Sequence, residues 1–88
     1  MTAFEIIFTS SAEKEIRRLP NSIIARVANR IDLISSNPFT IEHQKLFGHE
    51  NMFRCRVGDY RIVYSIDLKS KTITIERIRH RKDIYRKI

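Results

Sequence analysis

The stretch FRCRVGDYRIVYSI, residues 53–66, predicts a β-hairpin, and the rest of the fold can be built outward from it. Gly58 and Asp59 separate two segments with alternating side chains, the pattern of two antiparallel strands joined by a two-residue turn. Successive side chains of a strand point to opposite faces, so one face of this hairpin is apolar and needs a cover. The residues on that face are Phe53, Cys55, Val57, Tyr60, Ile62, Tyr64 and Ile66.

The opposite face of the hairpin carries three arginines, Arg54, Arg56 and Arg61. Because the apolar face has to meet the helices of the domain, the arginines are predicted to converge on the face that the helices leave uncovered. The sequence therefore predicts a positively charged sheet face.

A third strand is predicted from TITIERIRHR, residues 72–81, with Ile73 and Ile75 on its buried side. Strict alternation from these two residues would bury Arg77 and Arg79, which is unfavourable for charged side chains. We therefore predict a β-bulge, or the end of the strand, near Arg77.

The N-terminal part of the chain predicts one strand and two helices. AFEIIFT, residues 3–9, alternates as a strand, and SSAE, residues 10–13, matches the capping box that begins a helix. Pro20 ends this helix, and a second helix follows and stops before Pro38. The apolar stripe of the second helix is Ile23, Ile24, Val27, Ile31 and Ile34.

The segment at residues 39–51 shows no sustained period and is predicted to be a connection. The element order is then β-α-α-β-β-β in a single domain, residues 1–88. This order is typical of an α+β fold in which an antiparallel helical hairpin packs on one face of a small antiparallel sheet, formed by the N-terminal strand and a three-strand meander.

The positive charge is concentrated towards the C-terminus. The net charge is +7; residues 1–52 contain six Lys/Arg and six Asp/Glu, whereas residues 53–88 contain eleven and four. A field concentrated on one part of a small domain attracts a polyanion or an acidic partner. The simpler alternatives are a docking surface for a protein and a solvated basic surface without a partner.

Several classes of protein are excluded or disfavoured. No apolar run approaches the roughly 20 residues that span a bilayer, and the N-terminus lacks the basic region of a secretory signal, so a cytoplasmic location without membrane contact is expected. Cys55 is the single cysteine, and the histidines His43, His49 and His80 have no ligand-like spacing. We therefore expect no disulfide, no metal and no cofactor.

The lysines and arginines of residues 53–88 suit the cleavage of RNA. RNA carries its own nucleophile, the 2′-OH. A protein must align this oxygen with the phosphorus, stabilise the extra negative charge and move protons. Arginine binds phosphate oxygens well but transfers protons poorly. His80 and Tyr85 are therefore the candidates for proton transfer, and Tyr85 can alternatively stack on a base.

The segments KLFG at residues 45–48, GDYRIVY at residues 58–64 and HRKDIY at residues 80–85, in this element order, resemble the RelE/ParE superfamily of type II toxins, nearer the RelE side. The likeness extends over essentially the whole chain. It implies a ribosome-dependent endoribonuclease that cuts messenger RNA in the A site by 2′-OH attack, without metal, and that an antitoxin inhibits.

The resemblance also implies roles for individual residues. Arg61 is expected to hold the scissile phosphate, Arg81 to stabilise the transition state, and Tyr85 to orient the nucleotide or assist proton transfer. Arg54 and Arg56 occupy positions where the best-studied member has lysines, so they keep the charge but not the proton transfer. Further RNA contacts are expected from Lys45, Arg77, Arg79, Lys82, Arg86 and Lys87.

The expected partners are the ribosome, messenger RNA and a cognate RelB-like antitoxin, whose acidic segment would wrap the toxin in a hetero-oligomer. Two other functions stay open at this point. One is a ParE-like inhibitor of DNA gyrase without nuclease activity. The other is a non-toxic relic that retains only antitoxin binding.

Overall fold

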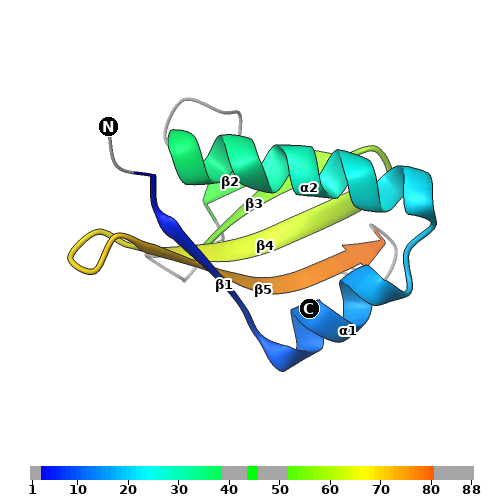
Figure 1. Ribbon diagram of the computed structural model, residues 1–88, viewed down its shortest axis with the longest axis horizontal. Coiled ribbons are helices and arrows are strands. Elements are labelled where there is room, and N and C mark those ends of the chain that lie inside the picture. Colours follow the sequence, from blue (N-terminus) through cyan, green and yellow to red (C-terminus); the bar gives the residue numbers. More distant parts are fainter. Residues whose placement is uncertain (1–2, 39–43, 46–51, 81–88) are drawn as a thin grey trace.

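The computed structural model describes residues 3–38, 44–45 and 52–80 (Figure 1). The elements are β1 (Glu5–Phe8), α1 (Ser10–Arg17), α2 (Asn21–Ser36), β2 (Gln44–Lys45), β3 (Met52–Val57), β4 (Tyr60–Asp67) and β5 (Thr72–His80). The predicted order of strand, two helices and three-strand meander is confirmed. The structure adds the two-residue strand β2, which lies in the segment predicted to be a connection only.

The five strands form one sheet in the order β1-β5-β4-β3-β2. β3, β4 and β5 are antiparallel neighbours, as predicted, and β2 adds to the outer edge of β3. β1, however, pairs with β5 in parallel, so the prediction of a wholly antiparallel sheet is wrong. The chain between β1 and β5 contains both helices and the strands β2, β3 and β4, and parallel neighbours need a long connection of this kind.

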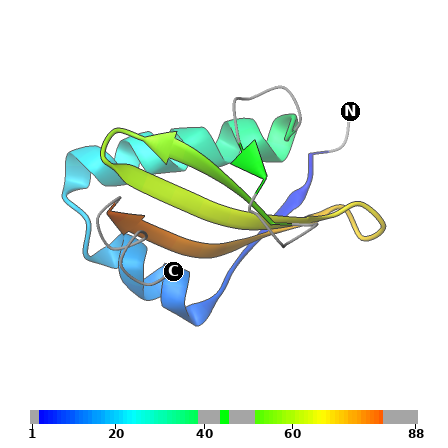
Figure 2. The same cartoon turned by 180° about the vertical axis from the view of Figure 1, so that it is seen from behind.

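Both helices lie on the same side of the sheet. Figure 1 shows them in front of the strands, with α2 crossing β3 and β4 and with α1 beside β5; Figure 2 shows the opposite face, where the strands lie in front. The core between the layers contains Ala12, Val27, Ile31, Ile34, Cys55, Val57, Ile62, Tyr64, Ile66, Ile73, Ile75 and Ile78. Neither helix in the described part of the chain is long and apolar enough to cross a bilayer.

The hairpin turn forms where the sequence predicts it. Gly58 has a φ of 60°, a left-handed conformation that glycine adopts without steric cost. A Cβ at this position would lie 3.3 Å from the guanidinium of Arg26 on α2, so the turn also has a close neighbour.

The first helix begins one residue earlier than the capping box predicts. Thr9 is the N-cap, and its hydroxyl oxygen accepts a hydrogen bond from the Ala12 N–H at 3.1 Å. Glu13, the predicted capping-box partner, instead forms an exposed ion pair with Arg17 at 2.8 Å. Thr9 and Ser10 are both good N-cap residues by type. Thr9 also contacts the sheet, because its hydroxyl donates a hydrogen bond to the Glu76 carbonyl at 2.9 Å.

The predicted bulge in the last strand is confirmed at Glu76. Val63 pairs with Arg77 and Tyr64 pairs with Ile75, so two adjacent residues of β4 face three residues of β5. The strand itself continues to His80. A bulge shifts the alternation by one residue, and as a result Ile75 and Ile78 are both buried although they are three positions apart.

Candidate functional site

Three arginines lie directly opposite one another across the sheet. Arg61 on β4 pairs with Arg56 on β3 and with Arg79 on β5. Directly opposite residues in antiparallel strands have Cα atoms about 4.5 to 5.5 Å apart and project to the same face. We call Arg56, Arg61 and Arg79 the arginine row.

A second line of side chains runs beside the arginine row, towards the middle of the strands. Val63 on β4 pairs with Arg54 on β3 and with Arg77 on β5. Arg54 and Arg77 therefore project to the same face as the row. We call this surface, made by Arg54, Arg56, Arg61, Arg77 and Arg79, the arginine face.

The bulge at Glu76 is what adds Arg77 and Arg79 to this surface. Without the extra residue, the alternation set by Ile73 and Ile75 would turn both arginines into the core. With it, they project to the same face as the arginines of the hairpin. The structure thus brings together five of the cations that were selected from the sequence.

The centre of the arginine face is less open than predicted. Arg61 is only 8% exposed and Val63 is also 8% exposed, whereas Arg56 is exposed to solvent. Arg61 and Val63 both belong to β4, the central strand of the sheet, so strands β3 and β5 flank them on both sides. A charge at such a position interacts more strongly with a bound anion than a solvated charge does, since less water screens it.

Directly opposite like charges destabilise a sheet, and the arginine row contains two such pairs. The guanidinium fork matches the geometry of phosphate oxygens, and a row of such groups can contact several oxygens of one anion. The arrangement is therefore suited to binding a phosphate group.

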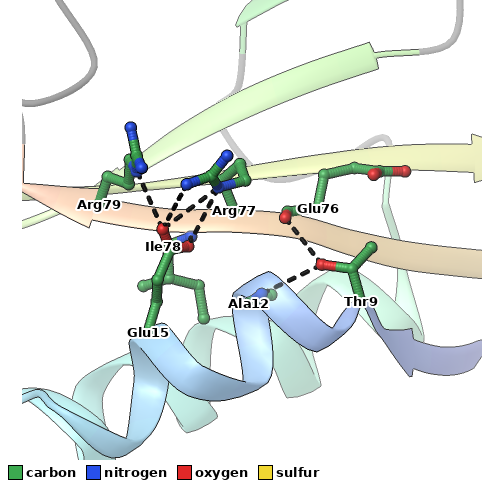
Figure 3. Close-up of polar contacts among 7 residues, drawn as sticks. All are labelled: Thr9, Ala12, Glu15, Glu76, Arg77, Ile78 and Arg79. Carbon is green, nitrogen blue, oxygen red and sulfur yellow. Dashed lines mark hydrogen bonds and ion pairs between the residues drawn. The ribbon is translucent and has the colours of Figure 1, made fainter. Parts of the chain in front are cut away.

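An acidic residue from the first helix reaches this surface. Glu15 on α1 accepts hydrogen bonds from Arg77 Nε and Nη2 at 3.2 and 2.8 Å, and from Arg79 Nε at 2.9 Å (Figure 3). Its other oxygen accepts the backbone N–H of Ile78 at 2.8 Å. Glu15 thus holds the edge of β5 and two arginine side chains with one carboxylate.

The pKa of Glu15 is lowered from its usual value of 4.5. Partial burial raises this pKa, but the hydrogen bonds from Arg77, the Ile78 N–H and Arg79 outweigh the effect of burial because they stabilise the charged form. The carboxylate therefore remains ionised in the complex with both arginines through the neutral range.

This pKa shift predicts a pH dependence of stability. A carboxylate whose pKa is lower in the folded state stabilises the fold above the unfolded-state pKa, and this contribution disappears as the pH falls through the folded-state pKa. The difference in melting temperature between the wild type and Glu15→Gln should therefore be largest near neutral pH and shrink below about pH 4.5. Glu13→Gln, which removes the exposed pair with Arg17, is the control and should show only a small difference throughout. A Glu15→Gln difference that grows in acid would contradict this assignment.

His80 is not in the arginine row. It pairs with Tyr60, and its ring contacts the Tyr60 ring edge-on with the centroids 5.3 Å apart. By alternation along β5, its side chain shares the face of Ile78 and not that of Arg79. The structure therefore does not bring His80 together with the arginines, and its suggested part in proton transfer gains no support from the geometry.

Cys55 and Tyr64 belong to the core, as the alternation predicts. Burial raises the pKa of the Cys55 thiol to about 11, an effect that the positive charge of Arg30 only partly offsets. Burial also raises the pKa of the Tyr64 hydroxyl. Neither group ionises in the neutral range, and both act as packing residues.

The remaining candidates fall outside the described residues or lack a described side chain. Arg81, Lys82, Tyr85, Arg86 and Lys87 lie beyond His80, where the described part of the chain ends. For Gln44 and Lys45 only the backbone of β2 is described, paired with β3 next to the arginine face. The roles of these residues stay predictions.

Two residues that shape the site were not selected from the sequence. Thr9 holds the carbonyl of the bulge residue Glu76, and Glu15 holds the arginines that follow the bulge. Both lie in an N-terminal part that has no net charge, more than 60 positions from their partners. The one signal that could have indicated Glu15 is its place on α1 at the helix face that also carries Ala12, which is buried.

The fold and the arginine face define a small α+β protein whose sheet carries helices on one side and a set of five arginines on the other. The chain matches the family described as the ParE toxin of the type II toxin-antitoxin system parDE over residues 6–85. The chain therefore belongs to the RelE/ParE superfamily of type II toxins.

Individual relatives agree with this assignment. Toxin RelE3 of Methanocaldococcus jannaschii is 32% identical over 85 residues, which cover 92% of this chain and 94% of the relative. Toxin RelG of Mycobacterium tuberculosis is also 32% identical over 85 residues, covering 96% of this chain and 98% of the relative. The archaeal RelE–RelB complex from Pyrococcus horikoshii OT3 contains a chain with the same fold, with a TM-score of 0.79, 29% identity and coverage of 92% and 97%.

Proposed function

We propose that this toxin is a ribosome-dependent endoribonuclease that acts in the cytoplasm and cuts messenger RNA in the A site. The observation that carries the proposal is the arginine row, with the buried Arg61 between Arg56 and Arg79. The RelE names of the relatives favour the same class of activity over gyrase inhibition. Inhibition of DNA gyrase by binding involves no phosphoryl transfer by the toxin itself, so it does not call for cations that stabilise a phosphorus transition state.

The proposed reaction needs no metal because RNA supplies the nucleophile. The 2′ oxygen attacks the adjacent phosphorus and loses its proton, the bond from phosphorus to the 5′ oxygen breaks, and that oxygen takes up a proton. The products are a 2′,3′-cyclic phosphate and a 5′-hydroxyl. Arg61 would hold a non-bridging phosphate oxygen, and the flanking arginines would stabilise the charge that builds up in the transition state.

The remaining roles follow the family resemblance. Arg81 would add to the charge stabilisation, and Tyr85 would orient the nucleotide or assist the proton transfer. Lys45, Lys82, Arg86 and Lys87 would contact the RNA backbone. His80 is left out of this set because its ring packs on Tyr60.

We also infer an acidic antitoxin as the partner that controls the activity. The related chain from P. horikoshii was solved in a RelE–RelB complex. A segment rich in Asp and Glu would complement the positive charge of the arginine face, and its affinity should fall with added salt.

The proposal is tested by adding the purified protein to a cell-free translation system and mapping the new ends of the messenger. Cuts in the A site that require ribosomes are expected. Cuts in naked RNA would instead indicate a free-standing ribonuclease. A parallel assay with DNA gyrase covers the ParE-like alternative: trapped DNA–gyrase complexes with intact messenger would overturn the proposal.

A non-toxic relic would be recognised in cells. Expression of a folded wild-type protein should stop growth if the proposal is correct. Normal growth, at a protein level confirmed by immunoblot, would favour a chain that retains antitoxin binding without toxicity.

A further inference from the structure

The two arginines that contact Glu15 are bound in different ways. Arg77 donates hydrogen bonds to Glu15 from both Nε and Nη2, so this edge of its guanidinium group is occupied by the carboxylate. Arg79 uses only Nε, at 2.9 Å. In Figure 3 the rest of the Arg79 guanidinium points away from Glu15, on the side of β5 opposite to α1.

The difference between the two arginines matters because a guanidinium group binds a phosphate most strongly when two of its nitrogens donate hydrogen bonds. An arginine held through Nε has its orientation fixed and can still present Nη1 and Nη2. Arg79 also lies directly opposite Arg61, whereas Arg77 lies opposite Val63. The Glu15 carboxylate holds both arginines, and of the two only Arg79 belongs to the arginine row.

The surroundings of Glu15 make the contact rigid. Its side chain is only 18% exposed, and the Arg79 side chain is 23% exposed. The Ile78 N–H binds the second carboxylate oxygen, so the carboxylate cannot rotate without breaking a hydrogen bond to the backbone. The α1 helix that carries Glu15 is itself tied to the bulge through Thr9.

We propose that Glu15 is a positioning residue for RNA cleavage: it binds Arg77 as an anchor and orients Arg79 so that its two terminal nitrogens meet the scissile phosphate beside Arg61. This inference rests on the proposed ribonuclease activity. It assigns a catalytic contribution to an acidic residue of the first helix, outside the basic C-terminal part of the chain. Glu15 touches neither the substrate nor the reacting atoms and acts through Arg79.

The test is a single-turnover assay on programmed ribosomes, with Glu15→Gln as the variant. Glutamine has the same shape and can still accept the Ile78 N–H, but it lacks the charge that orders both arginines. The maximal cleavage rate should fall about tenfold to a hundredfold, the scale of a misplaced catalytic group. The concentration for half-maximal rate should not rise, because the lost negative charge lies beside the arginine face and its removal does not weaken the attraction for RNA.

Glu13→Gln is the matched control. It lies on the same helix, is also paired with an arginine and causes the same change in charge, but its pair with Arg17 is exposed. Its cleavage rate should equal that of the wild type. Glu15→Asp, which restores the charge on a shorter side chain, should recover part of the lost rate.

A double-mutant cycle separates positioning from a general loss of structure. If Glu15 acts through Arg79, then Glu15→Gln should lower the rate in the wild type but not further in Arg79→Ala. An equal loss in both backgrounds would overturn the inference and assign Glu15 a purely structural role. A wild-type rate in Glu15→Gln would overturn it as well, with the ribonuclease activity intact. Absence of cleavage by the wild type is a different result, since it would refute the proposed function itself and the positioning role with it.

Discussion

Replacing Arg61 by alanine is expected to lower the rate of messenger RNA cleavage by about a hundredfold to a thousandfold. Arg61 is the middle member of the arginine row and is 8% exposed, so its charge acts where little water screens it. In cells the same variant should no longer stop growth. The rate is measured on programmed ribosomes, with the protein level and the circular dichroism spectrum matched to the wild type.

Because Arg61 is buried, a second variant is needed to separate chemistry from folding. Arg61→Lys keeps the positive charge and most of the side-chain volume but loses the planar fork, and it should fold normally while cleaving slowly. Arg17→Ala, an exposed change of the same charge on α1, should leave the rate unaltered. Full activity of both Arg61 variants would show that the arginine row is not the catalytic site.

The second large effect is expected from deletions in β5. Removal of Glu76 takes out the bulge and leaves Ile75 next to Arg77, which restores regular alternation without changing any pair with β4. The fold should survive, with a loss of about 1 kcal/mol for each of the hydrogen bonds that Glu76 accepts from Thr9 and Ser65. Removal of Thr74 leaves Ile73 next to Ile75, so that one buried isoleucine has to leave the core and a polar side chain has to enter it.

The Thr74 deletion should therefore cost about 2 to 5 kcal/mol for the displaced isoleucine alone, a large part of the stability of a small domain. Urea unfolding of the two deletion variants and the wild type measures the difference. If the Glu76 deletion unfolds the protein while the Thr74 deletion is tolerated, then the bulge at Glu76 does not determine the face to which Arg77 and Arg79 project.

The hairpin, the meander and the position of the bulge could be predicted because they depend on local patterns. Gly58 and Asp59 determine the turn, and the alternation on either side of them determines the faces. The bulge was predictable because Ile73, Ile75 and Arg77 cannot all follow one alternation without burying a charge. In each case the information lies within a few residues.

The remaining features depend on contacts between distant segments. The parallel pairing of β1 with β5 results from the long path of the chain between them, through both helices and the strands β2, β3 and β4, and not from a local pattern in either strand. Thr9 and Ser10 are equally good caps by sequence, and the carbonyl of Glu76, 67 positions away, decides between them. Glu15 is an ordinary helix residue until β5 is in place.

The nucleophile in the proposed reaction can be tested directly by removing it from the substrate. Programmed ribosomes carrying a messenger with a single 2′-deoxy nucleotide at the cleaved position should give no cut at that position, while the all-ribose messenger is cut and ends in a 2′,3′-cyclic phosphate. Equal cleavage of both messengers, or products ending in a free 3′-hydroxyl, would contradict attack by the 2′-OH and with it the role assigned to the arginine face.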